Sequence, residues 1–560
     1  MINQKLYLMK KRALTSITLI VCLFFTISIS LAQEILTTTQ WQEDLTYLQT
    51  TVHTDYPFLF KKVNADHFDT EVKKLYQEIP SLEPHELPVA FARIVSLFEY
   101  GHTQITFGTL AKGGVLPVNL YHFNDGIYIE GTQKGHKKVL GAKVLKVGGV
   151  SIEKALQLIR PVVPVENESY FKAYGLRFLT VPAVLHAQKV IPKLSSEVAL
   201  TLEKDGKTFT YDFPTIPLKE LSRGANFTIP TKNWLTIRDT TTTPLYLKYL
   251  HEKYYYFEYL PASKTVYVRQ SSVFNHDSET LKDFYTRLFA FIDSNIVDKL
   301  VYDVRLNGGG NNYNNLGLIK GLMARPKINK KGHFFYIIGR DTFSACQNLT
   351  NEIERYTEAI IVGEPTAENI NFYGDARRVT LPNSRLNVYL SFAWWQDVPQ
   401  WENKDATIPH LAVDMSVEEY KANQDPVLEV AMNYTDDGFI LNPMQHLTEL
   451  FVAGDFAGVK KDATTISKDP RYKYYKFEKE FTDAGMRIIG QGDKEAGLFI
   501  LDLVAELNPT SASALYNLAN LQVELKQTEK ARIIFKKIIA LDANSSLGKI
   551  AKRRIKELDK

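Results

Sequence analysis

Apolar residues in this 560-residue chain change their spacing several times, and each change predicts a different kind of structure. Between residues 40 and 98 they recur at helical intervals, as at Trp41, Leu45 and Leu48, which predicts a small helical region. From 113 to 214 they form short runs bounded by turn residues, which is typical of strands. The strands predicted there are 116–121, 127–130, 142–147 and 197–203. The chain therefore begins with helices and continues as a β-rich region.

Strands and helices alternate from residue 265 to residue 362. The predicted strands are 265–269, 299–304, 333–338 and 359–362, and the predicted helices are 278–292, 316–323 and 344–356. This alternation is typical of parallel strands joined by right-handed crossovers. A further strand is predicted at 386–392. We expect a site at the ends of these strands.

Two turns at strand ends carry the first candidate residues. The glycines of the turn 308–310 permit backbone torsions that other residues avoid. Ser344 lies at the next strand-to-helix junction, where it fits a capping box with Gln347. Alternatively Ser344 is a nucleophile, and the N–H groups of Ala345 and of Gly309 or a neighbouring glycine form an oxyanion hole. Taken alone, Ser344 leaves both interpretations open.

Two further polar residues become candidate site residues only if the fold brings them together. His102 lies at the turn that opens a predicted strand, 104–107, in which polar and apolar residues alternate. Glu402 lies in a loop after the aromatic cluster 392–395. A lone histidine in a turn and a lone glutamate in a loop are ordinarily surface residues. Glu402 becomes a candidate only near His102.

The C-terminal region repeats an apolar pattern with an offset of 34 residues. The matching pairs are Glu495 with Glu529, Phe499 with Ile533, Ile500 with Ile534, Val504 with Ile538 and Leu507 with Leu541. A period of 34 in paired helices is the tetratricopeptide signature. Two repeats are few for a free-standing array, so we expect them to pack on the preceding domain or to cap one another.

The N-terminus has the composition of a secretion signal. Four basic residues up to Arg12 precede an uncharged run, 13–32, which ends in a small-residue cleavage pattern before Gln33. We expect a secreted or periplasmic protein, and the alternative is an uncleaved membrane anchor because the run is long. Cys22 lacks the small residue before it that a lipoprotein signal shows, so we expect no lipidation.

Charge and cysteine content exclude several classes of function. Removal of residues 1–32 takes away four of the 67 basic residues, which leaves as many basic residues as the 63 acidic ones. The remaining chain is formally neutral, and this charge gives no indication of nucleic-acid binding. Cys346 then remains as the only cysteine, and no disulfide is expected. Metal-ligand spacings of the Cys-x-x-Cys or His-Glu-x-x-His type are absent from the sequence. We therefore expect no metal and no cofactor.

Several motifs together resemble the tricorn-like and C-terminal-processing serine peptidases. The motifs are Gly101-His102-Thr103, Asp303-x-Arg305-x-Asn307-Gly308-Gly309-Gly310, Thr342-Phe343-Ser344-Ala345, Gly363-Glu364-Pro365-Thr366 and Trp401-Glu402 to Ile408-Pro409. The match runs from about residue 40 to 432, and the stretch 139–155 resembles the strand, glycine turn and helix start of a PDZ domain. Such domains accept an extended peptide as an added strand. The resemblance implies a crotonase-like αβ core with a PDZ-like domain.

The same resemblance implies catalytic roles. It places the nucleophile at Ser344, the general base at His102 and a supporting carboxylate at Glu402, with Gly309 and Ala345 at the oxyanion. The processing-protease branch uses a lysine where this chain has Asn369, so a Ser–Lys pair is not expected.

Two departures from the tricorn-like pattern change residues that would orient the histidine. The serine that precedes the histidine is Gly101 here, so we expect Thr103, a water or direct contact with Glu402 to replace it. The aspartate after the closing proline is His410 here. The nucleophile at Ser344 is unaffected by either change.

We therefore predict a multidomain α/β protein. The expected parts are a signal peptide (1–32), an N-terminal helical domain (33–110), a PDZ-like β-rich domain (111–215), a linker (216–244), a peptidase core (245–440), a second linker (441–484) and tetratricopeptide-like repeats (485–560).

The leading functional hypothesis is a serine peptidase that acts on peptides or unfolded proteins, with a protein partner for the C-terminal repeats. The alternative is a catalytically inactive binding protein for hydrophobic ligands or peptides on the same scaffold, which Gly101 and the aromatic cluster 392–395 favour. A third hypothesis gives the repeats the main role, as an adaptor. We expect no nucleic-acid partner, and a membrane only if the signal is uncleaved.

Overall fold

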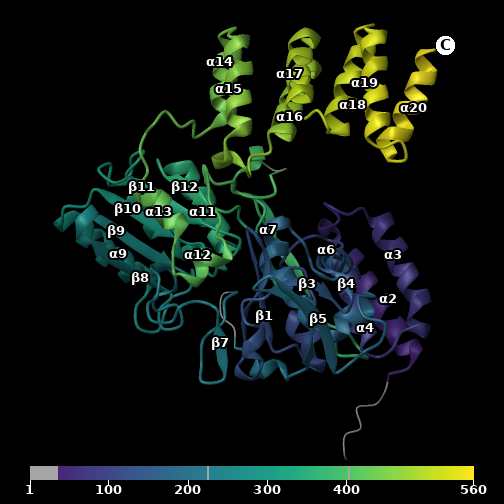
Figure 1. The fold of residues 1–560 in the computed structure, drawn as a ribbon, viewed down its shortest axis with the longest axis vertical. Coiled ribbons are helices and arrows are strands. Elements are labelled where there is room, and N and C mark those ends of the chain that lie inside the picture. The colour runs from purple at the N-terminus through teal and green to yellow at the C-terminus, as the bar shows by residue number, and fades with distance from the viewer. Residues whose placement is uncertain (1–35, 223–225, 402–403, 560) are drawn as a thin grey trace, which may run out of the picture.

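The computed structural model describes residues 36–222, 226–401 and 404–559, so the predicted signal peptide and Glu402 lie outside it. The chain forms a mixed α/β protein with a helical N-terminus, an antiparallel sheet, a mixed sheet flanked by helices, and a C-terminal stack of helical hairpins (Figure 1). This is the predicted fold class. Within the described residues, no helix has the length and apolar character needed to cross a bilayer.

The N-terminal helices are α2 (Thr38–Asp55), α3 (Ala65–Glu78) and α4 (Glu86–Ser96). The predicted strand at 104–107 is wrong. Gln104 makes a single bridge to Tyr389, and the Thr106 hydroxyl caps a short helix, α5 (Phe107–Leu110), by accepting the Thr109 N–H. The capping hydrogen bond of Thr106 therefore favours a helix here over the strand that the alternating polar and apolar pattern predicts.

The antiparallel sheet contains all four strands predicted in the β-rich region. Its strands are β1 (Val118–Phe123), β2 (Gly126–Gln133), β3 (Lys143–Val147), β4 (Val150–Ser151), β5 (Glu197–Lys204), β6 (Lys207–Pro214) and β7 (Trp234–Thr236). Its helices are α6 (Ile152–Ile159), α7 (Glu168–Tyr170) and α8 (Pro182–Ala187). The segment 216–244 is not a plain linker, because β7 pairs with β2. The sheet and the N-terminal helices share one hydrophobic core.

The second sheet has the strand order β15-β12-β11-β10-β9-β8, and only its edge pair, β8 with β9, is antiparallel. Its strands are β8 (Tyr255–Leu260), β9 (Thr265–Gln270), β10 (Lys299–Asp303), β11 (Phe334–Ile338), β12 (Ile360–Gly363) and β15 (Leu411–Ala412). The crossover helices are α9 (Leu281–Ser294), α10 (Leu316–Met323) and α11 (Ala345–Tyr356), which pack on one face. The predicted alternation of strands and helices is confirmed.

A long hairpin connects the two bodies of the molecule. It consists of β13 (Phe372–Thr380) and β14 (Asn387–Trp395), which pair antiparallel. Val388 and Leu390 of β14 are buried in the core formed by the N-terminal helices and the first sheet. The hairpin, which follows β12 in the chain, therefore packs against the N-terminal body, which contains His102.

Helices cover the other face of the second sheet and continue into the C-terminal stack. They are α12 (Val417–Lys421), α13 (Pro426–Met432), α14 (Pro443–Val452), α15 (Phe456–Lys468), α16 (Phe477–Gly490), α17 (Lys494–Leu507), α18 (Ala512–Glu524), α19 (Thr528–Leu541) and α20 (Ser546–Leu558). The predicted linker 441–484 is wrong, because α14, α15 and part of α16 occupy it. Leu447, Val459 and Ile466 are buried in one cluster with residues of the sheet. The hairpins form a row along one end of the molecule (Figure 1).

Candidate active site

Ser344 has a strained backbone at the junction between β11 and α11. Its φ is 57° and its ψ is −129°, a combination that residues with a side chain rarely adopt. Its side chain makes no capping hydrogen bond to the helix, so the predicted capping box with Gln347 is wrong. The Gln347 amide instead donates to Asn351 and Thr407. Strain of this kind, of order 1–3 kcal/mol, persists where the surroundings enforce it, and it clusters at functional sites.

The glycine turn after β10 holds Ser344 in place. The Phe343 N–H donates to the Asn307 carbonyl at 3.1 Å, which joins the two turns. A Cβ atom built on Gly309 would lie 2.6 Å from Ser344 Cβ, so only glycine permits this approach. Arg305 anchors the start of the turn through ion pairs with Asp303 and Asp425, both at 2.8 Å.

The two predicted oxyanion donors have different surroundings. The Gly309 N–H already donates to the Asn307 side chain at 2.9 Å. Ala345 is the first residue of α11, and its nitrogen would lie 3.0 Å from a Cβ on Gly309. An N–H group in the first turn of a helix has no partner within the helix and lies at the positive end of the helix dipole. Ala345 is therefore the better placed donor.

His102 lies next to the segment that contains Ser344. Its ring stacks on Phe343, the residue before Ser344, at 4.8 Å between ring centroids. His102 Nε2 is 3.5 Å from Oε2 of Glu368, and the Ser344 N–H donates to the same oxygen at 2.9 Å. The imidazole and the Ser344 backbone are therefore neighbours across one carboxyl oxygen. Within the described chain, His102 Nε2 is buried and has no hydrogen-bond partner.

Two buried carboxyl groups complete the site. Glu166 and Glu368 are fully buried as side chains, and their mutual repulsion disfavours ionisation of both. Burial raises the pKa of Glu368 to about 8, and it raises the pKa of Glu166 well above its usual value. Lys62 Nζ, 3.9 Å from Glu166, partly offsets the burial. The pair therefore titrates as a unit above the usual carboxyl range.

Burial also lowers the pKa of His102, although Glu166 and Asp375 oppose this effect. About a fifth of its side chain is exposed, so the ring is partly accessible. The imidazole is therefore neutral at neutral pH. A neutral imidazole is the form that accepts a proton.

The segment around His102 explains why glycine precedes it. A Cβ atom on Gly101 would lie 2.5 Å from the Tyr170 ring and 2.8 Å from the Phe343 ring, so a serine does not fit without displacing them. The Gly101 N–H donates to Glu166 at 2.8 Å. Thr103 does not replace the missing serine, because its hydroxyl bonds the Ser391 hydroxyl and accepts the Ser391 N–H. The buried carboxyl group of Glu166 therefore accepts from the backbone of the residue that takes the place of the expected serine.

The sequence motifs did not identify Glu166 or Glu368. Glu368 follows a buried strand and lies in the mostly uncharged stretch Ala367 to Phe372, a signal that was available but weak. Glu166 comes from a segment that is distant in sequence. The predicted support residue, Glu402, lies outside the described residues. Asn369, where a lysine base would lie, is buried.

The aromatic cluster after the core is engaged with the protein itself. Trp394 packs on Tyr373 at 4.7 Å between ring centroids and lies under the Lys61 ammonium at 4.3 Å. Trp395 donates its indole N–H to Asp375 at 3.1 Å. These contacts account for the cluster without a bound apolar ligand.

Comparison with known proteins finds no matching family model and no matching curated protein. The structure is similar to that of mature CPAF, with 12% identity, coverage of 72% of this chain and 99% of that chain, and a TM-score of 0.45. It is similar to the photosystem II D1 C-terminal processing protease, with 13% identity, coverage of 68% and 94%, and a TM-score of 0.33. It is also similar to the tricorn protease, with 13% identity, coverage of 71% and 36%, and a TM-score of 0.33. At these values the likeness assigns no residue and no activity.

Proposed function

We propose that the chain is a serine peptidase that hydrolyses peptides or unfolded proteins, with Ser344 as nucleophile and His102 as general base. The observation that carries the proposal is the arrangement around Glu368. One oxygen of this carboxyl group contacts both the backbone of a strained serine and an unpartnered nitrogen of a neutral histidine.

Proton transfer follows from this arrangement. His102 Nε2 takes the proton of the Ser344 hydroxyl as Oγ attacks the peptide carbonyl, and it then gives that proton to the leaving amine. A water molecule repeats the sequence on the acyl-enzyme and releases the second product. The strained backbone of Ser344 fixes the hydroxyl at the helix start, which lowers the entropy cost of attack.

The tetrahedral intermediate carries a negative charge on the former carbonyl oxygen. The Ala345 N–H is placed to stabilise this charge, together with an N–H of the glycine turn that adjoins Ser344. Removing one such donor typically costs about 3 kcal/mol of transition-state stabilisation.

The carboxyl pair supports the imidazolium that forms during attack. In its ionised form Glu166 raises the pKa of the His102 ring. This charge favours protonation of the ring at the moment of reaction. Glu402 stays a predicted second support for the histidine.

The cellular setting is also a proposal. The uncharged N-terminal run favours a secreted or periplasmic peptidase. The C-terminal helical hairpins, with their period of 34, favour tetratricopeptide-type repeats that hold a protein partner.

The test is cleavage of a denatured protein by the purified chain. Wild type should generate new amino termini, and both Ser344→Ala and His102→Ala should abolish them while circular dichroism shows an unchanged fold. If a broad peptide library is not cleaved and an apolar probe binds wild type and Ser344→Ala equally, the chain is a binding protein and the peptidase proposal is wrong.

A further inference from the structure

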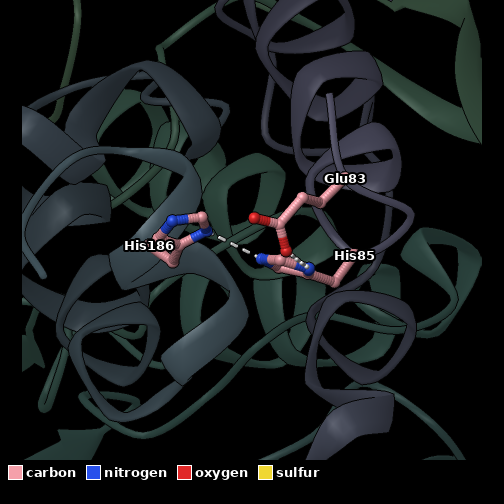
Figure 2. A group of neighbouring side chains, drawn as sticks. All are labelled: Glu83, His85 and His186. Atoms are coloured by element: carbon pink, nitrogen blue, oxygen red, sulfur yellow. Dashed lines mark hydrogen bonds and ion pairs between the residues drawn. The ribbon is translucent and has the colours of Figure 1, made fainter. Parts of the chain in front are cut away.

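A group of potential metal ligands lies outside the candidate active site, where the start of α4 meets α8. Glu83 and His85 precede α4, and His186 belongs to α8, 101 residues after His85. His85 Nε2 lies 2.8 Å from His186 Nδ1, and one donor atom from each of the three side chains lies within 4.8 Å of the others. Figure 2 shows the Glu83 carboxylate beside the gap between the two rings.

A second carboxylate borders this group. Oε1 of Glu86 is 3.7 Å from His186 Nδ1. Glu86 is nearly fully buried, and its other oxygen accepts the Glu83 N–H at 3.0 Å, so its position is fixed. Two imidazoles and two carboxylates are donor types that zinc accepts in tetrahedral sites.

The group can also be explained as a set of polar contacts without a metal. One ring then donates to the other, and the Lys189 ammonium pairs with Glu86 at 3.0 Å. Two observations favour an ion. The Lys189 side chain that pairs with Glu86 is 71% exposed, so it can withdraw into water when a metal arrives. The Glu83 side chain is 62% exposed, which gives an ion a route from solvent.

The two imidazoles are largely enclosed by the protein. His186 is buried, and the His85 side chain is 17% exposed, so the surrounding packing holds both rings in place.

We propose that Glu83, His85 and His186 bind a divalent transition-metal ion of the zinc type, with Glu86 as the fourth ligand. The ion joins the N-terminal helices to the β-rich body at a point where α4 begins. The sequence motifs could not indicate this site, because the spacing Glu-x-His-Glu is completed by a histidine from a distant helix. No residue assigned to peptide hydrolysis takes part in it.

The test is competition for Zn²⁺ between the chain, purified without a histidine tag and stripped with a chelator, and a chromogenic zinc indicator. Wild type should withdraw one ion per chain from the indicator. His85→Ala and His186→Ala should each weaken binding by about 100-fold or more, since even the loss of an indirect partner costs 10–100-fold. Lys189→Ala should tighten binding, because it removes the competing cation.

The control is His53→Ala, which removes a histidine paired with a single carboxylate, Asp69, at 2.8 Å. It should bind Zn²⁺ like wild type. Should His186→Ala fail to fold, His85→Ala decides, because it truncates a less buried ring. Co²⁺ should give the strong visible absorption of a four-coordinate ion in wild type and not in His85→Ala. Equal Zn²⁺ affinity of wild type and His85→Ala, or no withdrawal of zinc by wild type, would overturn the proposal.

Discussion

Two serines at helix starts have opposite surroundings, and the difference separates a structural role from a chemical one. Ser416 begins α12 with φ −81° and forms a full capping box with Glu419. Ser344 begins α11 with φ 57° and makes no side-chain cap. Both backbone N–H groups donate to a glutamate, at 2.7 Å for Glu419 and 2.9 Å for Glu368. Only the second glutamate is fully buried beside a histidine.

A serine at a helix start therefore does not indicate function by itself. Its backbone torsions and its hydrogen-bond partners distinguish the two roles. Ser416 uses its hydroxyl to stabilise the helix. The Ser344 side chain makes no hydrogen bond to the start of its helix, and the Ser344 backbone is strained. A serine that begins a helix without a capping hydrogen bond therefore indicates a nucleophile better than the presence of a serine alone.

The largest difference should appear when each serine loses its hydroxyl. Ser344→Ala should reduce the rate of peptide cleavage by at least about 10⁴-fold, because it removes the proposed nucleophile. Ser416→Ala should leave that rate unchanged and lower the free energy of unfolding by about 1 kcal/mol through loss of the cap. Initial rates and urea unfolding of the two variants measure both effects. Equal rates for the two variants would break the comparison.

The second difference concerns the histidine that accompanies only Ser344. His102→Ala should reduce kcat/KM by about 10²–10⁴-fold, the usual contribution of a general base. Because burial lowers the pKa of His102, its neutral form persists below pH 6.5, and wild-type activity should be lost only at lower pH. The acidic side of the pH profile of kcat/KM measures this loss of activity.

A suitable control for this profile is His446→Ala, which removes a histidine paired with Asp462 at 2.7 Å in the C-terminal stack. It should keep the wild-type rate and profile. An acidic limb above pH 6.5 in wild type would contradict the assigned environment of His102.

The third difference concerns Glu368 and Glu419, the glutamates that accept the two serine N–H groups. The pKa of Glu368 is raised to about 8, so the folded protein holds a proton that the unfolded chain releases near the usual carboxyl pKa. Stability should therefore fall as pH rises from the usual value toward 8, by about 1.4 kcal/mol per pH unit for one proton. Glu368→Gln should flatten this slope, and Glu419→Gln, at the ordinary cap, should leave it unchanged. Urea unfolding of the three proteins across this range checks the prediction. Parallel slopes for wild type and Glu368→Gln would show that Glu368 is ionised in the folded state.

The smallest difference is in backbone strain. Glycine adopts positive φ readily, so Ser344→Gly should raise the free energy of unfolding by about 1 kcal/mol while it abolishes cleavage. Ser416→Gly should not raise it, since the φ at that position suits any residue. A destabilised Ser344→Gly would mean that the hydroxyl, and not the strain, dominates the energetics at this helix start.

The sequence predicted features that depend on local periodicity and failed where distant segments decide. The helix at 316–323 and the strands around Ser344 were found because their apolar spacing is regular. The sequence predicts a linker at 441–484, although α14 and α15 bury their apolar faces against the core. The motifs indicated Ser344 and His102. Glu166 and the ligands around His186 could not be found, because the fold alone assembles them.

The most direct test of the central claim is covalent labelling with a fluorophosphonate probe, followed by mass mapping of the modified peptide. The account predicts one modified residue, Ser344, with labelling strongly slowed in His102→Ala and unaffected in Ser416→Ala. Failure of folded wild type to react, or modification at another serine with Ser344 intact, would contradict the assignment of Ser344 as the nucleophile.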